Sequence, residues 1–483
     1  KVKHAQGVDI TRIFCGLNDV RNIAASIKWA KEAGMTAQAT MCITYSQVHN
    51  AKYYMNMADQ LVEAGAQEIC LKDMAGIGRP TMLGEIVKYI KTKYPNIIVQ
   101  YHGHTGPGFS VASMLEIAKA GGDVFDVAIE PLSWGMVHPD VITIQQMFKE
   151  AGFTVPDINM KAYMEARRLT QSFIDDFLGY FIDPRNRFMS SLLVGCGLPG
   201  GMMGSLMADL KGVHAVINAG LKAQGKAELS EDELLVQLFD EVKYIWPKLG
   251  NPPLVTPFSQ YVKNVALMNV LSMSKGQGRW TMIDNNTWGM ILGKAGKLPG
   301  KLDPEIIELA KAQGKEFFTG NPQDNYPDVL PEFRGRMKEL GWDFGQDDEE
   351  LFEFAMHEKQ YREYKSGEAK RRFNRELEEK MTAKFKAAGV SVIPDLRQLR
   401  HPNAEPVVAP VAGTLLWEFD YEDKSYAPAP GKEYKKGDYL CAIQTSFNLE
   451  IVYAPFDGVI VEATKEQGAR IAKNDTIAFI EKF

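Results

Sequence analysis

Two histidines separated by one glycine are the first residues whose spacing suits chemistry. His102 and His104 end the β-type run IIVQYHGHTG (97–106). Because side chains alternate along a strand, both imidazoles lie on the same side of it. Two imidazole nitrogens placed in this way can bind one metal ion. A pair of ordinary polar loop residues is the alternative, but the position of the pair at the end of a strand favours metal ligands.

A lysine holds a similar position one β-type run earlier. Lys72 ends the mostly apolar run EICLK and precedes the sequence DMAG. Burial of a charged amine is costly and lowers its pKa, so part of the lysine is a free amine. A free amine reacts with CO₂ to form a carbamate, whose oxygen can bind a metal. The alternative, which residue types alone favour, is a lysine paired with a nearby Asp or Glu.

Two further positions have both a chemical and a structural interpretation. Thr256 follows the sequence GNPPLV and precedes a helical pattern, so its hydroxyl either caps that helix or passes a proton to a substrate. Gly200 and Gly201, in the segment GLPGG (197–201), predict a structural turn before a helix.

Regularly spaced strands and helices must position these residues. Five β-type runs have centres near residues 13, 41, 70, 100 and 126, at intervals of 28, 29, 30 and 26. Helical patterns that end in glycine, such as 20–34 and 53–65, lie between them. Strand and helix alternating at this period predict βα units and a parallel sheet.

Five units fit either of two α/β folds. An open doubly wound sheet can stop at five strands, whereas a (β/α)₈ TIM barrel needs eight. No glycine-rich phosphate loop follows the first run, and polar residues gather at the ends of the later runs. We therefore predict a TIM barrel whose first three units lie upstream of Lys1.

The sequence after the five units predicts a helical extension and a small β-domain. Residues 1–154 are expected to form the partial barrel, 155–392 a mainly helical extension, and 393–406 a proline-bearing linker. Short β-type runs return in 407–483, where Ala409-Pro410-x-x-Gly413 recurs as Ala454-Pro455-x-x-Gly458. This repeat predicts a small quasi-twofold β-sandwich, and extra residues around DKSYAPAP predict a protruding loop.

Composition limits the class of protein. The 483 residues carry 55 Lys and Arg against 61 Asp and Glu, a net charge of −6. This balance gives no electrostatic reason to bind DNA or an anionic membrane surface. Five scattered cysteines and the lack of a long apolar run predict a cytoplasmic protein without disulfides or membrane helices. Three cysteines, Cys15, Cys42 and Cys70, lie in apolar runs and are expected to be buried thiols.

The order of the motifs resembles a known family. The motifs are RIFCGLND (12–19), CLKDMAG (70–76), HGHTG (102–106), AIEPLSWG (128–135), LPGGMM (198–203) and VTPFSQ (255–260). Together they resemble the carboxyltransferase of biotin-dependent keto-acid enzymes, which include pyruvate carboxylase, oxaloacetate decarboxylase and transcarboxylase. The resemblance covers roughly residues 7–380.

This resemblance implies a fold, a cofactor and a reaction. A helical funnel covers the mouth of a (β/α)₈ barrel that holds a divalent metal such as Zn²⁺, Mn²⁺ or Co²⁺. His102, His104 and a carbamylated Lys72 match the family's metal ligands. Thr256 matches the threonine that moves a proton between biotin and the enolate of the substrate. The family's first-strand motif, D-x-x-x-R-D-x-x-Q, is not found here, and Cys15 stands where the family usually has Asp.

The tail resembles a biotinyl carrier domain with an altered attachment site. In that family a hairpin presents the biotinylated lysine within the sequence AMKM. Here Phe447 occupies the lysine position, between Ser446 and Asn448, and no lysine lies between Lys436 and Lys465. A phenylalanine cannot form an amide with biotin, so the resemblance implies biotin carried on another polypeptide.

Three functions remain open from the sequence. The first is a carboxyltransferase that moves CO₂ between oxaloacetate or pyruvate and biotin on a biotin carrier protein or biotin carboxylase subunit. The second is a non-catalytic assembly subunit that uses the tail for docking. The third is a metal-dependent aldol-type lyase. The resemblance also implies a homo-oligomer and leaves open a membrane decarboxylase partner.

Overall fold

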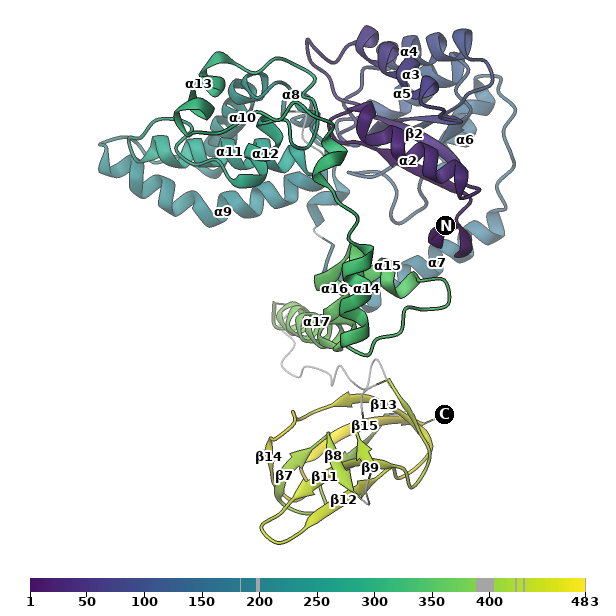
Figure 1. The fold of residues 1–483 in the computed structure, drawn as a ribbon, viewed down its shortest axis with the longest axis vertical. Coiled ribbons are helices and arrows are strands. Elements are labelled where there is room, and N and C mark those ends of the chain that lie inside the picture. Colours follow the sequence, from purple (N-terminus) through teal and green to yellow (C-terminus); the bar gives the residue numbers. More distant parts are fainter. Residues whose placement is uncertain (183, 197–199, 388–403, 422–423, 429–430, 483) are drawn as a thin grey trace. The chain divides into compact units, whose positions relative to one another are not determined.

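The computed structural model describes residues 1–482 except 183, 197–199, 388–403, 422–423 and 429–430. The chain divides into two compact units, Lys1–Gly367 and Glu368–Phe483 (Figure 1).

The first unit is built on a parallel sheet of five strands in the order β1-β2-β3-β4-β5. The strands are β1 (Ile10–Phe14), β2 (Thr36–Cys42), β3 (Glu68–Asp73), β4 (Ile98–Gly103) and β5 (Val124–Phe125). Each overlaps one of the five β-type runs in the sequence, and only β2 begins one residue earlier than its run. The α/β class and the parallel sheet are therefore confirmed.

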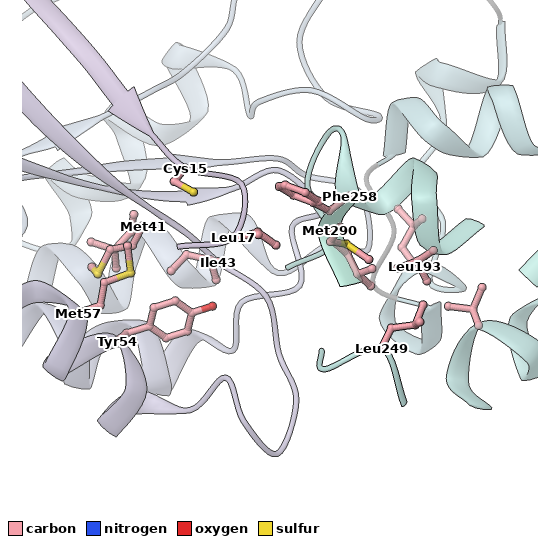
Figure 2. Packing of buried hydrophobic residues seen from close by; sticks show 14 of the residues in the cluster. Cys15, Leu17, Met41, Ile43, Tyr54, Met57, Leu193, Leu249, Phe258 and Met290 are labelled. Atoms are coloured by element: carbon pink, nitrogen blue, oxygen red, sulfur yellow. The ribbon is translucent and has the colours of Figure 1, made fainter. Parts of the chain in front are cut away.

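Helices connect the strands and cover the apolar face of the sheet (Figure 1). They are α2 (Val20–Glu32), α3 (Ala51–Glu63), α4 (Pro80–Lys93), α5 (Ser110–Lys119) and α6 (Val141–Glu150), and a short α1 (Val2–Ala5) precedes β1. Met41 of β2 packs with Tyr54 and Met57 of α3 (Figure 2). The next residues along each strand point to the opposite face, because side chains alternate.

That opposite face of the sheet carries a layer of polar side chains. Gln38 of β2 donates to Glu68 of β3 over 2.7 Å and to Gln100 of β4 over 2.8 Å. Arg12 of β1 donates to Gln38 over 2.6 Å. The polar layer therefore runs across neighbouring strands and ties their register together.

The rest of the first unit is mainly helical, as predicted. The longer helices are α7 (Met160–Asp176), α9 (Gly200–Ala223), α10 (Glu231–Lys248), α11 (Phe258–Ser274), α13 (Pro304–Ala312) and α14 (Leu330–Glu339). Shorter ones are α8 (Leu193–Cys196), α12 (Asn285–Ile291), α15 (Glu349–Met356), α16 (Glu358–Lys365), η1 (Leu178–Tyr180), η2 (Pro184–Arg187) and η3 (Pro322–Asn325). Gly200 and Gly201 begin α9 and do not form a turn before it, and 197–199 lie outside the described residues.

Contacts fasten this helical part to the end of β1. The ring of Phe258, at the start of α11, would lie 2.7 Å from a Cβ added to Gly16. Asn22 donates to the carbonyl of Ala295 over 2.9 Å. Figure 2 shows Phe258 and Met290 in the same buried cluster as Cys15 and Leu17. One hydrophobic core thus joins the sheet and the helices that follow it.

The second unit holds helix α17 (Glu368–Ala387) and antiparallel β-structure. Its two four-stranded sheets run in the orders β10-β13-β15-β6 and β12-β11-β7-β14 and share one apolar core. The strands are β6 (Ala404–Val408), β7 (Gly413–Leu416), β10 (Glu433–Tyr434), β11 (Tyr439–Gln444), β12 (Leu449–Tyr453), β13 (Gly458–Ala463), β14 (Arg470–Ile471) and β15 (Thr476–Lys482). Residues 393–403 of the expected linker lie outside the described residues, and Ala404 already belongs to β6.

The internal repeat appears as a pair of equivalent contacts. The amide of Ala409 donates to the carbonyl of Asp475, and that of Ala454 donates to the carbonyl of Asp438, both over 2.8 Å. Each motif of the repeat is therefore held by the same kind of backbone bond. The extra residues of the first half include the hairpin β8 (Phe419–Tyr421) and β9 (Lys424–Tyr426).

Two predictions on cysteines and membranes can be compared with the structure. Cys15, Cys42 and Cys70 are buried free thiols, as expected, and Cys441 is a fourth. In the described part of the chain, none of the helices has the length and apolar character needed to cross a membrane.

Gly76 provides a test of how closely the loop after β3 approaches the loop after β4. Its φ of +67° is left-handed, and an added Cβ would lie 2.3 Å from the carbonyl oxygen of His104. We expect Gly76→Ala to lower the free energy of unfolding by about 3 kcal/mol or more, because backbone strain and a backbone clash add. Urea denaturation measures the loss.

Gly314 provides the matched control for this substitution. Its φ is +65°, and nothing lies within 4 Å of an added Cβ. Gly314→Ala should therefore cost only the left-handed strain, about 1 kcal/mol. Equal losses for the two variants would show that the loops are not in contact at Gly76.

Candidate metal centre

Three of the predicted site residues, Lys72, His102 and His104, lie at the carboxyl ends of neighbouring strands. His102 lies on β4, and Lys72 lies beside it on β3, where the two residues are register partners. His104 follows β4 directly. The polar face of the sheet carries Lys72 and His102 together, as strand alternation predicts.

A third histidine joins the predicted pair. His138, in the loop after β5, offers a ring nitrogen to a group in which the ligand atoms of His102, His104 and His138 all lie within 4.8 Å of one another. Within the described residues, no other group of three His, Cys, Asp or Glu side chains meets this condition. His138 lacks the HxH spacing, so it was not predicted. The chain has only eight histidines, and one that follows the next strand was the available signal.

Each of the three imidazoles is held by its Nδ1 atom. His102 Nδ1 lies 2.6 Å from Asp126 Oδ2, His104 Nδ1 lies 2.8 Å from the carbonyl of Met136, and His138 Nδ1 lies 2.9 Å from the carbonyl of Gly103. Carboxylate and carbonyl oxygens only accept hydrogen bonds, so each Nδ1 must carry the proton. In a neutral ring, Nε2 then offers a lone pair.

Two of these lone pairs face each other. The Nε2 atoms of His102 and His104 are 3.2 Å apart. Two acceptors at this distance repel unless a proton or a metal ion lies between them. Burial, with His138 and His102 nearby, lowers the pKa of His104 to about 3, so its ring is a poor site for an extra proton. The cluster is therefore suited to a cation that takes several nitrogen ligands, such as a divalent transition metal.

Asp126 fixes the orientation of His102. Besides His102, its carboxylate accepts hydrogen bonds from Gln100 and from Arg12, the latter over 2.7 Å. Burial by itself raises the pKa of Asp126, but the hydrogen bonds from His102 and Arg12 outweigh it and hold the pKa well below its usual value. The carboxylate therefore stays ionised and keeps the His102 Nδ1–H in place.

Lys72 is partly buried and has no carboxylate partner. Within the described part of the chain, no Asp or Glu oxygen lies within 4.0 Å of its Nζ atom; instead Nζ lies 5.6 Å from the centre of the Phe14 ring. Burial lowers the pKa of Lys72. The alternative of an ion-paired lysine is thus not what the described part of the structure contains, and burial favours the neutral amine over the charged one.

Thr256 lies in the turn before α11 and does not cap that helix. Pro257 is the residue at the N-cap, and no side chain makes a capping hydrogen bond there. The carbonyl oxygen of Thr256 would lie 3.4 Å from a Cβ added to Gly16, just after β1. The turn that holds Thr256 therefore lies near the carboxyl end of β1. The side chain of Thr256 is exposed there.

The fold is similar to that of a solved carboxyl transferase domain. The carboxyl transferase domain of Rhizobium etli pyruvate carboxylase, solved with oxamate and biotin, matches with a TM-score of 0.61 and 19% identity. The match covers 99% of this chain and 71% of that one. At this identity the likeness concerns the fold.

Sequence comparisons find two family models and several relatives that match this chain. The model described as "Conserved carboxylase domain" matches residues 221–398, and the model described as "HMGL-like" matches residues 15–133. A pyruvate carboxylase subunit of Methanocaldococcus jannaschii is 27% identical over 480 residues, 99% of this chain and 75% of the relative. The methylmalonyl-CoA carboxyltransferase 5S subunit of Propionibacterium freudenreichii subsp. shermanii is 32% identical over 359 residues, 72% of this chain and 65% of the relative.

The chain is thus similar to carboxylases and carboxyltransferases along most of its length. The 2-oxoglutarate carboxylase large subunit of Hydrogenobacter thermophilus is a further relative, 28% identical over 314 residues. That match covers 64% of this chain and 44% of the relative. The chain spans three quarters of the Methanocaldococcus protein and less than two thirds of the other two relatives.

The role of Asp126 can be tested by Asp126→Asn. Asparagine keeps one acceptor oxygen but turns an NH₂ group toward one of the three donors that Asp126 now satisfies. We expect His102 to lose its fixed Nδ1–H tautomer, as read from two-bond ¹H–¹⁵N NMR spectra. Affinity for Zn²⁺, measured by calorimetry, should fall about 10- to 100-fold.

Asp157→Asn is the control, since Asp157 is exposed and pairs only with Lys149. It should leave both the tautomer and the affinity unchanged. An unaltered His102 tautomer in Asp126→Asn would contradict the proposed orienting contact.

Proposed function

We propose that this chain is a metal-dependent carboxyltransferase that moves CO₂ between a 2-keto acid and biotin carried on another subunit. The observation that carries the proposal is the convergence of free Nε2 lone pairs from His102 and His104, beside Lys72, in a chain similar to carboxylases and carboxyltransferases. Relatives named for pyruvate and 2-oxoglutarate carboxylation support a 2-keto acid as substrate.

The residues present fit a divalent metal. Because Nδ1 carries the proton in each ring, Nε2 is a neutral nitrogen ligand. Such ligands suit Zn²⁺ and Co²⁺ better than Mn²⁺, which prefers oxygen. His102 and His104 would hold the ion. When bound, it supplies a Lewis acid that stabilises the negative charge of a keto-acid enolate.

Lys72 would supply an anionic oxygen to the same ion. Its lowered pKa leaves part of the amine unprotonated, and the nitrogen lone pair can attack the carbon of CO₂. A new N–C bond forms, one N–H proton passes to solvent, and a carbamate with one negative charge results. Its position beside His102 in the register of β3 and β4 supports this role.

Thr256 would move a proton during carboxyl transfer. In the direction of oxaloacetate decarboxylation, the bond between C3 and the departing carboxylate carbon breaks and leaves its electron pair on the enolate of pyruvate. CO₂ forms a bond to N1 of biotin, and N1 loses its proton. The Thr256 hydroxyl accepts this proton and gives its own to C3 of the enolate, so the hydroxyl is restored.

The wider architecture of the proposal is a TIM barrel with a helical funnel. Strands β1 to β5 would form five of the eight barrel strands in residues 1–154, and residues 155–392 the funnel. The structural likeness to carboxyl transferase domains supports this assignment. Residues 404–483 would be a biotinyl-like sandwich, because Ala404–Pro406, expected to end the linker, pair with β15 as part of β6.

Biotin is proposed to come from a biotin carrier protein or biotin carboxylase subunit. Phe447 lies at the tip of the β11–β12 hairpin, where the Thr445 hydroxyl accepts from the amide of Asn448 over 2.9 Å and donates to its carbonyl over 2.8 Å. This turn presents Phe447, 93% exposed, at the position of the family's biotinylated lysine. Its side chain has no group that biotin can acylate.

The same phenylalanine favours a second candidate function, that of an assembly subunit. A large apolar side chain held on a rigid hairpin tip is suited to insertion into a partner's pocket. In this alternative the tail serves for docking, and the chain does not transfer CO₂.

Thr256→Ala tests the proposed proton transfer. Loss of the hydroxyl should lower the rate of biotin-dependent oxaloacetate decarboxylation by the intact protein about 10²- to 10⁴-fold. Metal content should stay unchanged, because Thr256 is not among the proposed ligands. Thr256→Ser keeps the hydroxyl and should retain most of the activity. A Thr256→Ala protein that decarboxylates at the full rate would exclude the role.

The Phe447→Ala variant separates the two candidate functions. For a carboxyltransferase, intact mass should show no covalent biotin, and free or carrier-bound biotin should support transfer at an unchanged maximal rate in the variant. For an assembly subunit, transfer is absent from both proteins and Phe447→Ala weakens complex formation in sedimentation. Val408→Ala removes another exposed apolar side chain of the same unit and serves as control. Covalent biotin on the chain would refute the proposal of biotin in trans.

A further inference from the structure

We infer that His138 is a third metal ligand, so that the chain holds its ion by three imidazoles in addition to any oxygen from Lys72. This inference rests on the proposed metal-dependent function, and it concerns a residue outside the HxH and lysine motifs. It also predicts which metal the site prefers.

The loop that carries His138 is fastened at several points around it. The amide of Thr105 donates to the carbonyl of Val137 over 2.7 Å, and that of Trp134 donates to the carbonyl of His138 over 2.8 Å. The amide of Ala128 donates to the carbonyl of Pro139 over 2.9 Å. The backbone of His138 is thus fixed against the residues that follow β4 and β5, which is what a metal ligand requires.

The ring of His138 is oriented in the same way as those of the other two histidines. Its Nδ1–H donates to the carbonyl of Gly103, the residue between His102 and His104. The ring centroid lies 4.4 Å from that of His102 and 4.8 Å from that of His104, with interplanar angles of 83° and 70°. One ring nitrogen from each of the three histidines lies within 4.8 Å of those of the other two.

A merely structural role does not explain this arrangement. If His138 only fastened the loop, its hydrogen bond to the carbonyl of Gly103 would be enough. That role does not explain why its second ring nitrogen lies close to the ring nitrogens of His102 and His104. Convergence of three lone pairs is stable once a cation is shared among them.

Three nitrogen donors make the site selective. Imidazole suits Zn²⁺ and Co²⁺ better than Mn²⁺, which prefers oxygen ligands. Three neutral donors also leave the charge of a divalent ion uncompensated. An anionic oxygen, from Lys72 after carbamylation or from a keto-acid carboxylate, is therefore the expected additional ligand class.

X-ray absorption spectroscopy of the intact protein loaded with Co²⁺ tests the inference, because it counts imidazole ligands without reference to activity. We expect three imidazoles in the wild type and two in His138→Gln, whose side-chain NH₂ can still donate to the carbonyl of Gly103. Affinity for Co²⁺ should fall at least ~10-fold in His138→Gln, and the preference for Co²⁺ over Mn²⁺ should narrow.

His214→Gln is the matched control, since a ring nitrogen of His214 also bonds to a backbone carbonyl, that of Leu229, over 2.7 Å and lies outside the cluster. It should keep three imidazoles and the wild-type affinity. If His138→Gln does not fold, the wild-type spectrum alone decides.

Two imidazoles in the wild-type spectrum, or an unchanged affinity in a folded His138→Gln protein, would overturn the inference. If the spectrum shows two imidazoles and transfer depends on metal, the proposed function stands and only the role of His138 is refuted. If it shows three imidazoles and the protein transfers no CO₂, His138 is a ligand and the proposed function is refuted. A protein that binds no metal would overturn both.

Discussion

The hydrogen bonds at the three Nδ1 atoms are the interactions on which the candidate site depends. An imidazole can bind a metal through either ring nitrogen, and its ring can rotate. The acceptors Asp126, Met136 and Gly103 remove both freedoms, so that Nε2 is the free nitrogen in each ring. Two of these acceptors are backbone carbonyls, which means that the path of the chain itself, rather than side chains alone, sets the chemistry.

Regular periodicity explains which features the sequence predicts well. The five strands, the helices between them and the shared face of Lys72 and His102 all follow from repeats of fixed length. The hairpin position of Phe447 follows from the internal repeat and the motif comparison. These are local patterns, or patterns repeated at a constant spacing, and each can be counted along the chain.

Features that depend on an irregular loop were not predictable in the same way. His138 reaches the cluster through a loop whose path is set by bonds to Thr105 and by positive φ angles at Trp134 and Gly135. Thr256 was open to a capping interpretation because the sequence does not show that Pro257 occupies the N-cap. Gly200 and Gly201 are the first residues of α9, and glycine is equally compatible with a turn, so the residue types alone did not decide between the two.

The polar layer across the sheet has a consequence for the fidelity of folding. Gln38, Glu68, Gln100 and Arg12 bond to one another from four neighbouring strands. A strand that pairs one residue out of step would turn its polar side chains toward the helices and its apolar ones toward this layer. Such a sheet would lose buried hydrogen bonds and apolar contacts together. Arg12 and Gln100 of this layer also hold the Asp126 carboxylate that orients His102. Correct strand register and the orientation of His102 therefore depend on the same hydrogen-bond network.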